Sequence, residues 1–477
     1  MRVEANRMNK EIRSKIEAYF AEQQPKMIED LMALIEIPSV RGEAQEGMPF
    51  GVGPAIALRK AVELMQARGL QVKTYGDCVA TGDLTDLESG LDILAHLDVV
   101  PAGDNWTVCQ PFEPIIVDGN LYGRGAIDDK GPAIAALYAM TCIRDLGIPF
   151  KKNVRLILGT DEECGSGDLE HYYSVEQEAP MTFTPDANFP LINMEKGRLC
   201  GEVDAKFHYD ETLPYIASAD SGLKSNVIPE KAEAVVVGLS PMELASYMTA
   251  AAEKTGAKFT ADTENGAVRI VCQGVGGHAA YPETANNALT ALLELLVTLP
   301  CADSEGFRKL KALQTLFPHG DYSGKALGVD MKDEISGPLT LSADLLHFDE
   351  TSLYLCFDSR CPVCSNDENT RLASMKKIAD AGLSMRETTM VLPHYVSADS
   401  DFVRTLLKVY EDWTGIKGEA EATGCGTYVH DLKNGVAFGC EMAGIDNRLH
   451  NADEFITLDQ FLLSAKIFAQ AILELCC

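Results

Sequence analysis

A histidine and a carboxylate end an apolar stretch near residue 95 in a pattern that suits metal chemistry. The segment ILAHLDVVPAGDNW, residues 93–106, is typical of a buried strand that ends in His96 and Asp98, just before a turn. Side chains two residues apart on a strand point to the same face, so Asp98 can accept the second imidazole N–H of His96. A carboxylate in this place fixes the tautomer of a metal-ligating histidine.

Two further acidic clusters follow predicted strands or lie in nearby turns. YGRGAIDDKGP contains Asp128 and Asp129, and GTDEECGSGD contains Asp161, Glu162 and Glu163. Ligands of open α/β sheets bind beyond the carboxyl ends of the strands, so we expect the three clusters to share one crevice. Crowded carboxylates resist ionisation, and divalent cations would resolve that conflict. A histidine among the ligands favours zinc or manganese over magnesium or calcium.

Each cluster alone also has an ordinary structural explanation. A single histidine at a strand end is more often a hydrogen-bonded structural residue, and a pair of adjacent carboxylates is usually a solvated turn. The coincidence of three clusters in matching positions favours the metal site. By contrast, the CPVC spacing of Cys361 and Cys364 has no second such pair, and it predicts incidental packing rather than a zinc site.

The composition limits the class of protein. The chain has 477 residues, 46% of them hydrophobic, which is enough for two domains. Its 41 Lys and Arg against 71 Asp and Glu give a net charge of −30, which argues against a nucleic-acid partner and for small molecules or peptides. We find no signal-peptide pattern and no apolar run of membrane-spanning length, so we expect a soluble, cytoplasmic protein without a membrane partner. The 14 cysteines fit reduced thiols.

The elements that must position these residues follow an α/β order. Apolar runs at residues 91–100 and 154–160 predict buried strands, and residues 131–147 predict a helix between them. From about residue 198 the sequence pattern changes to strands of alternating polar and apolar residues, each followed by a helix. Near residue 391 it returns to longer apolar helices. We therefore expect an α/β catalytic domain, with a mixed, mostly parallel sheet flanked by helices, that is split by an inserted α+β domain. The expected segments are residues 1–197, 198–390 and 391–477.

Six segments together resemble the superfamily of di-metal aminopeptidases, carboxypeptidases and aminoacylases, and within it the PepV-type dipeptidases of bacteria. In chain order from residue 96 to residue 456 they are HLDVVPAGDNW, GRGAIDDKGP, TDEECGSGD, PDANFP, GVGGHAAYPETANNA and RLHNADEFI. The resemblance implies two divalent metal ions, zinc or manganese, per chain. It also implies hydrolysis of unblocked dipeptides and a lid function for the inserted domain.

The resemblance assigns five metal ligands. His96 and Asp186 would bind one ion, Glu163 and His450 would bind the other, and Asp128 would bridge both. A cis peptide bond would join Asp128 to the next residue. Two ions held in this way can generate a nucleophile from water at neutral pH and polarise the scissile carbonyl.

Three residues receive catalytic roles from the same resemblance. Glu162 would be the general base that takes a proton from the metal-bridging water, and Asp98 would orient the histidine ligand. His278, from the inserted domain, would donate to the carbonyl oxygen as negative charge develops. Without the resemblance, His278 could equally be a turn histidine between glycines.

The substrate contacts are also implied by the resemblance. Arg360 would bind the free carboxylate of the peptide, for which a planar guanidinium is suited, and Asn226 would help to position the substrate. Gly424, Gly426 and Thr427 would let the backbone approach the substrate closely. On its own residues Arg360 could instead form a surface ion pair, and the role of the nearby His430 stays open.

Fold and metals do not separate the activities of this superfamily. An N-acyl amino acid amidohydrolase or deacetylase is the first alternative, and a non-catalytic metal-binding protein is the second. Glu162 argues against the latter, because a degenerate site has little reason to retain a base beside the ligands. The inserted region is larger than a dimerisation lid requires, so we expect a monomer that supplies its own His278, with a dimer as the alternative.

Overall fold

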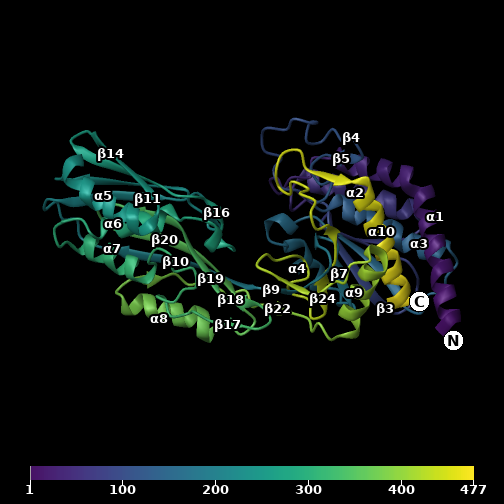
Figure 1. Cartoon of the computed structure of the whole chain (residues 1–477). Coiled ribbons are helices and arrows are strands. Elements are labelled where there is room, and N and C mark those ends of the chain that lie inside the picture. The colour runs from purple at the N-terminus through teal and green to yellow at the C-terminus, as the bar shows by residue number, and fades with distance from the viewer. Residues whose placement is uncertain (1) are drawn as a thin grey trace. The chain divides into compact units, whose positions relative to one another are not determined.

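The computed structural model describes residues 2–477 of the chain, with side chains from residue 10 onward. It divides into two compact units (Figure 1). Unit 1 comprises Met1–Met194, Tyr395–Ala422 and Gly426–Cys477, and unit 2 comprises Glu195–His394 and Thr423–Cys425. The chain therefore leaves unit 1 after Met194 and returns to it at Tyr395, some 200 residues later.

The central sheet of unit 1 is mixed and mostly parallel in its middle. Its order is β1 (Gln71–Tyr75), β2 (Val79–Asp83), β6 (Asn153–Gly159), β3 (Ser89–His96), β7 (Thr182–Thr184), β24 (Gly435–Ala437), β9 (Ile192–Glu195) and β22 (His394–Tyr395), with β23 (Glu421–Thr423) paired to β9. The neighbours β6, β3, β7 and β24 run parallel to one another, whereas β1, β2 and β9 pair antiparallel. The predicted α/β class with a mostly parallel central sheet is confirmed.

Helices cover both faces of this sheet. The helices of unit 1 are α1 (Arg2–Ile35), α2 (Val52–Ala67), α3 (Lys130–Asp145), α4 (Gly167–Tyr173), α9 (Asp401–Thr414) and α10 (Leu458–Cys476). Ile93 and Ala95 of β3 pack into the large core built with α1, α2, α3, α9 and α10, whereas Leu94 packs with α4 on the other face. Burial on both faces explains why β3 is mostly apolar instead of alternating with polar residues.

Asp92 is an acidic residue in the middle of β3, and its side chain is completely buried. Burial raises the pKa of its carboxyl to about 7, and the positive charge of the neighbouring Arg155 opposes this shift only in part. The folded protein then holds the proton more tightly than the unfolded chain does, so stability is lost as the pH rises from about 4 to about 7.

We expect Asp92→Asn to increase the free energy of unfolding by about 4 kcal/mol at pH 8 and by less than half of that at pH 5. The neutral amide occupies the same volume as the carboxyl and never carries the charge that burial disfavours. Urea denaturation of both proteins at the two pH values measures the difference. An equal gain at pH 5 and pH 8 would contradict the titration of this carboxyl as its cause.

Unit 2 is an antiparallel sheet with helices packed against it, which confirms the predicted α+β class. The strand order is β14 (Lys258–Glu264), β15 (Ala267–Gln273), β13 (Lys231–Val237), β11 (Tyr215–Ser221), β19 (Thr340–Phe348), β20 (Ser352–Cys361), β10 (Gly197–Lys206) and β21 (Ser384–Met385). Its helices are α5 (Pro241–Thr255), α6 (Ala288–Leu296), α7 (Glu305–Leu316) and α8 (Ala373–Asp380). Alternation along β13 buries Ala232, Ala234 and Val236 in the core with these helices.

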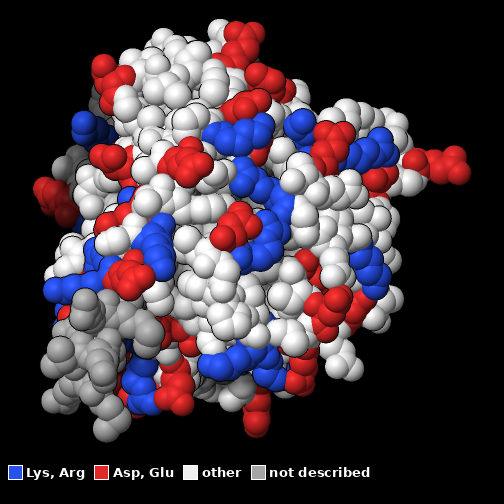
Figure 2. Space-filling view, turned by 90° about the vertical axis from the view of Figure 1, so that its right-hand side faces the viewer, with Lys and Arg blue, Asp and Glu red and all other residues white. Residues whose placement is uncertain are grey.

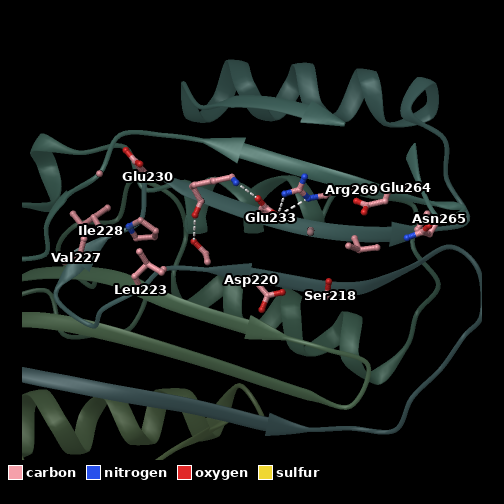
Figure 3. A pocket seen from close by; sticks show the side chains of 18 residues that line it. Ser218, Asp220, Leu223, Val227, Ile228, Glu230, Glu233, Glu264, Asn265 and Arg269 are labelled. Atoms are coloured by element: carbon pink, nitrogen blue, oxygen red, sulfur yellow. Dashed lines mark hydrogen bonds and ion pairs between the residues drawn. The ribbon is translucent and has the colours of Figure 1, made fainter. Parts of the chain in front are cut away.

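The opposite face of this sheet carries polar side chains. There Glu233 of β13 accepts hydrogen bonds from Nε and Nη2 of Arg269 of β15, at 3.0 and 2.6 Å (Figure 3). Short strands complete the two units: β4 (Ile115–Val117), β5 (Asn120–Tyr122), β8 (Ala187–Asn188), β12 (Val227–Ile228), β16 (Gly277–His278), β17 (Lys332–Asp333), β18 (Gly337–Pro338), β25 (Cys440–Glu441) and β26 (Phe455–Thr457).

The surface carries many charged side chains of both signs (Figure 2). Lys and Arg side chains are interspersed with Asp and Glu side chains on the face drawn in Figure 2. Across residues 2–477, none of the helices combines the length and the apolar character that are needed to cross a lipid bilayer. All 14 cysteines lie in the described part of the chain, and each is a free thiol.

Candidate active site

Two groups of side chains that could hold a metal ion lie next to one another in unit 1. One group is His96, Asp128 and Asp186, and the other is Asp128, Glu163 and His450, so that Asp128 belongs to both. In each group the potential ligand atoms all lie within 4.8 Å of one another. The structure therefore brings together the five residues to which the resemblance gave metal ligation, from positions spread over most of the chain.

The distances show how directly the ligand atoms face each other. Nε2 of His96 lies 2.9 Å from Oδ1 of Asp128 and 3.5 Å from Oδ2 of Asp186. Nε2 of His450 lies 2.8 Å from Oδ2 of Asp128 and 3.3 Å from Oε1 of Glu163. The two carboxylate oxygens of Asp128 thus face different histidines, which is the arrangement that a bridging ligand requires.

The central sheet explains why these residues meet. His96 is the last residue of β3, Asp186 follows β7, and Glu163 lies in the short helix η1 (Glu162–Cys164) that follows β6. These three strands are parallel neighbours, so their carboxyl ends open on the same edge of the sheet, where ligands of such folds bind. Asp128 and His450 come from the loops before α3 and β26.

Asp98 lies beside His96 as expected, but it contacts the imidazole mainly through its main chain. Nδ1 of His96 is 3.0 Å from the carbonyl oxygen of Asp98 and 3.5 Å from its carboxylate Oδ1. The carboxylate instead accepts the backbone N–H groups of Glu162 and Glu163, at 3.2 and 3.1 Å. Asp98 therefore fixes the tautomer of His96 and also holds the start of η1, which carries both glutamates.

Glu454 is a structural residue of the site that the sequence did not single out. Its buried Oε1 accepts the backbone N–H groups of Gly125, Ile127 and Asp128, at 3.0, 3.1 and 3.3 Å, and its Oε2 pairs with Nη1 of Arg124 at 2.5 Å. These bonds fix the loop that presents Asp128, including its cis peptide bond to the next residue. Glu454 lies within the segment RLHNADEFI, which was the only signal available for it.

A second structural pair lies beneath the loop of Glu162. The hydroxyl of Tyr428 donates to the buried carboxylate of Asp168, which also accepts the backbone N–H of Asp161 at 3.0 Å. The ring of Tyr428 packs edge-on against that of His96, with the centroids 6.1 Å apart. Asp168 ends the segment GTDEECGSGD but was not singled out from the sequence, and here it supports the loop between β6 and α4.

The residues fit a pair of divalent cations. Among the side chains of residues 10–477, Nε2 of His96 and Oε1 of Glu163 have no hydrogen-bond partner although both are buried. Each instead faces a charged neighbour, Asp128 and His450 respectively. Burial, together with the adjacent carboxylates, raises the pKa of Glu162 well above its usual range. Bound cations would give these atoms a partner and would offset the crowded negative charge that raises the pKa of Glu162. A donor set of imidazole and carboxylate suits zinc or manganese.

Three of the predicted substrate-contacting residues, Asn226, Arg360 and Gly424, belong to unit 2, as does His278. The carbonyl of Asn226 accepts the N–H of Ala279 at 3.0 Å, next to His278. The other contact joins Nη1 of Arg360 to the carbonyl oxygen of Gly424 at 2.7 Å. Arg360 is 7% exposed, so it is a buried residue rather than part of a surface ion pair.

Gly426 and Thr427 follow in sequence but belong to unit 1. The N–H of His430 bonds back to the carbonyl of Thr427 at 3.0 Å, within the turn that ends at His430. This bond gives His430 a place in the turn and leaves its chemical role undefined. The glycine loop is thus divided between the two units after residue 425.

The chain matches Peptidase family M20/M25/M40 over residues 93–474, and it belongs to that family. It is 37% identical over 459 residues to the protein YtjP of Bacillus subtilis (strain 168), covering 94% of this chain and 97% of that one. It is 31% identical over 456 residues to the Beta-Ala-Xaa dipeptidase of Lactobacillus delbrueckii subsp. lactis, covering 94% and 96%. These matches confirm the prediction of an enzyme of the dipeptidase type.

Solved structures share the fold at low sequence identity. Human carnosine dipeptidase 1 superposes with a TM-score of 0.59 at 15% identity, covering 97% of this chain and 98% of that one. Aminoacylhistidine dipeptidase from Vibrio alginolyticus gives 0.57 at 14% identity, covering 95% and 97%. At these identities the likeness concerns the fold alone.

Proposed function

We propose that this enzyme hydrolyses the peptide bond of unblocked dipeptides with the help of two divalent cations, zinc or manganese, and with Glu162 as general base. The observation that carries the proposal is the pair of ligand groups that share Asp128 at the carboxyl ends of parallel strands. The similarity to a dipeptidase over nearly the whole chain supports the choice of substrate.

The chain's own residues have distinct tasks in this reaction. His96 and Asp186 would hold one cation, Glu163 and His450 the other, and Asp128 both. When bound, the two cations would lower the pKa of a water molecule and polarise the scissile carbonyl. Glu162 would accept the proton of the attacking water at its carboxylate and deliver it to the leaving amine.

The adjacent glutamates can divide these tasks because Asp98 holds both of their backbone N–H groups. With the backbone fixed, the side chains of Glu162 and Glu163 leave neighbouring positions of η1 in different directions. One can then ligate while the other stays available for proton transfer. Asp98 therefore acts on the reaction through the residues that it positions.

The contacts of His278 leave its Nε2 available as a donor. The N–H of Ala280 donates to Nδ1 of His278 at 3.1 Å, so the proton of the neutral imidazole is on Nε2. Burial, followed by the positive charge of Arg360, lowers the pKa of the imidazole below its usual range, which favours the neutral ring. We propose that Nε2–H donates to the substrate's carbonyl oxygen as it becomes negative.

We expect His278→Ala to lower kcat by about 10² to 10³, with little change in KM, because the hydrogen bond forms fully only in the transition state. Steady-state kinetics on one dipeptide measures both constants. His208, an exposed histidine of the same unit that pairs with Glu305, provides the matched control, and His208→Ala should leave both constants unchanged. A rise in KM alone for His278→Ala would refute the role.

The remaining contacts recognise the two ends of the substrate. We propose that Arg360 binds the free carboxylate, that Asn226 and the loop of Gly424, Gly426 and Thr427 line the bound peptide, and that Asp186 serves the free amine. Leaving such polar groups unpaired disfavours substrates with a blocked terminus. Unit 2 would then act as a lid domain, inserted into the catalytic domain of residues 1–197 and 391–477 as residues 198–390.

Two further properties complete the proposal. We place the enzyme in the cytoplasm, because its 14 free thiols suit a reducing compartment. We also propose that it is a monomer, whose own unit 2 supplies His278. Size-exclusion chromatography with light scattering distinguishes a monomer of 51.7 kDa from a dimer.

A substrate panel tests the proposed function. The purified protein is assayed with unblocked dipeptides, tripeptides and N-acetylated amino acids after addition of zinc or manganese. Cleavage confined to unblocked dipeptides is the expected result. Preference for the acetylated compounds would identify an N-acyl amino acid amidohydrolase instead, and metal binding without any turnover would identify a non-catalytic metal-binding protein.

A further inference from the structure

Two arginines lie directly opposite each other in unit 2. Arg198 of β10 and Arg360 of β20 are register partners in an antiparallel pair, and like charges in such positions destabilise a sheet. The negative charge of Asp358 reduces the repulsion between the two arginines. Its fully buried carboxylate accepts Nε of Arg198 at 2.6 Å through Oδ2 and Nε of Arg360 at 2.6 Å through Oδ1.

This cluster keeps an excess of positive charge. One carboxylate lies between two guanidinium groups, so these three side chains carry a net charge of +1. The neighbouring Cys200, whose thiol pKa is lowered to about 7 by its contact with Cys356 and by the charge of Arg198, offsets only part of it. Nη1 of Arg360 donates to the carbonyl of Gly424 at 2.7 Å, which fixes that guanidinium but adds no negative charge. The cluster therefore attracts a negatively charged ligand.

Arg198 has unused donors for such a ligand. Its side chain is 38% exposed, and within residues 10–477 its two terminal nitrogens have no hydrogen-bond partner in the protein. Arg360 is held more rigidly and is almost buried. Paired guanidinium groups of this kind match the two oxygens of one carboxylate.

The cluster also lies within electrostatic reach of His278. After burial, the positive charges of Arg360 and, more weakly, Arg198 lower the pKa of the His278 imidazole, while Asp358 opposes them. The two arginines are therefore close to the residue that we expect to face the scissile carbonyl. In a dipeptide the terminal carboxylate is only one residue away from that bond.

We propose that Arg198 is a second specificity-determining residue for the free carboxylate of the substrate, beside Arg360, and that Asp358 is the positioning residue that holds both guanidinium groups. The inference rests on the proposed function for the identity of the substrate as a dipeptide. The anchor itself serves any substrate that ends in a free α-carboxylate, including an N-acyl amino acid.

The test compares one dipeptide with the same dipeptide as its C-terminal amide, on the metal-loaded protein. For Arg198→Gln we expect KM for the free dipeptide to rise about tenfold or more, with kcat within a factor of two. The amide lacks the carboxylate, so its KM should stay at the wild-type value. Arg198→Lys, which keeps the charge but not the planar group, should fall between the two.

Asp358→Asn tests the positioning role. Its amide can still accept one hydrogen bond but carries no charge, so both guanidinium groups lose their fixed orientation. We expect KM for the free dipeptide to rise more than in Arg198→Gln, again without an effect on the amide substrate. Because a buried residue is changed, circular dichroism and the thermal midpoint are measured alongside, and the half-exposed Arg198 carries the conclusion if this variant does not fold.

Arg269 supplies the matched control. It is an arginine paired with a carboxylate, Glu233, on the outer face of the same sheet (Figure 3). It lies on β15, four strands from β20 in the sheet order and thus about 19 Å away. Arg269→Gln removes the same charge and should leave KM for both substrates unchanged.

The inference is overturned if Arg198→Gln changes KM for the free dipeptide and the amide equally, or not at all. Failure of the proposed function gives a different result. If the wild type cleaves N-acetyl amino acids in place of dipeptides, the same comparison is made between an N-acetyl amino acid and its amide. If there is no turnover, calorimetric dissociation constants of the free dipeptide and its amide replace KM.

Discussion

Glu162→Gln is expected to lower kcat by about 10³-fold or more, which lies within the range that general base catalysis contributes. Glutamine preserves the shape of the side chain and the backbone N–H bond to Asp98, but it cannot accept a proton. Because Glu162 belongs to neither ligand group, metal analysis of the variant should still find two ions per chain. Single-turnover kinetics on a dipeptide, combined with elemental analysis of the same sample, provides both numbers.

The adjacent glutamate provides the contrast that makes this result specific. Glu163→Gln alters a residue of the second ligand group, whose Oε1 faces His450 at 3.3 Å, and should lose one ion together with activity. The two variants therefore differ in metal content while both lose turnover. If Glu162→Gln also lost metal, the assignment of base and ligand would be reversed. If it kept wild-type turnover, the base would be another residue.

The ends of the sheet strands are the part of the site that the sequence predicted best. A buried parallel strand is a largely apolar run, and the polar residue that follows the run marks its end, as His96 does after residues 93–95. The rule that ligands bind at the carboxyl ends of such strands then placed the clusters at residues 96, 128 and 162 together. The assignment of Asp186 and His450 needed the resemblance, because both lie in loops without a periodic pattern.

Contacts between distant segments could not be read in the same way. Glu454 holds the loop of Asp128 through three backbone N–H groups that are more than 300 residues away in the chain. Asp358 was visible only as a neighbour of Arg360, and Arg198 carried no signal at all. Their roles depend on strand register, which a sequence of alternating residues leaves open. The carboxylate of Asp98 also found different partners from those expected, because the turn after β3 presents its carbonyl to the imidazole first.

Removal of the metal ions is expected to abolish activity and to lower the stability of unit 1. Without cations, the carboxylates of Asp128, Asp186 and Glu163 remain crowded in a buried site, where burial raises the pKa of the Asp186 and Glu163 carboxyls. Each ion that binds only the folded chain adds about 3 kcal/mol when its free concentration is 100 times its dissociation constant. Dialysis against a chelator should therefore lower the thermal midpoint, and zinc or manganese should restore both properties.

Variants of the ligands separate a shared site from two independent ones. Asp128→Asn changes the residue that belongs to both groups and should reduce the bound metal from two ions to nearly none. Asp186→Asn and His450→Ala each change one group and should retain about one ion, with activity lost in both. Titration with zinc, followed by elemental analysis after gel filtration, measures the stoichiometry. Equal loss from all three variants would mean that the two ions bind only as a pair, and full retention by Asp128→Asn would contradict a bridging carboxylate.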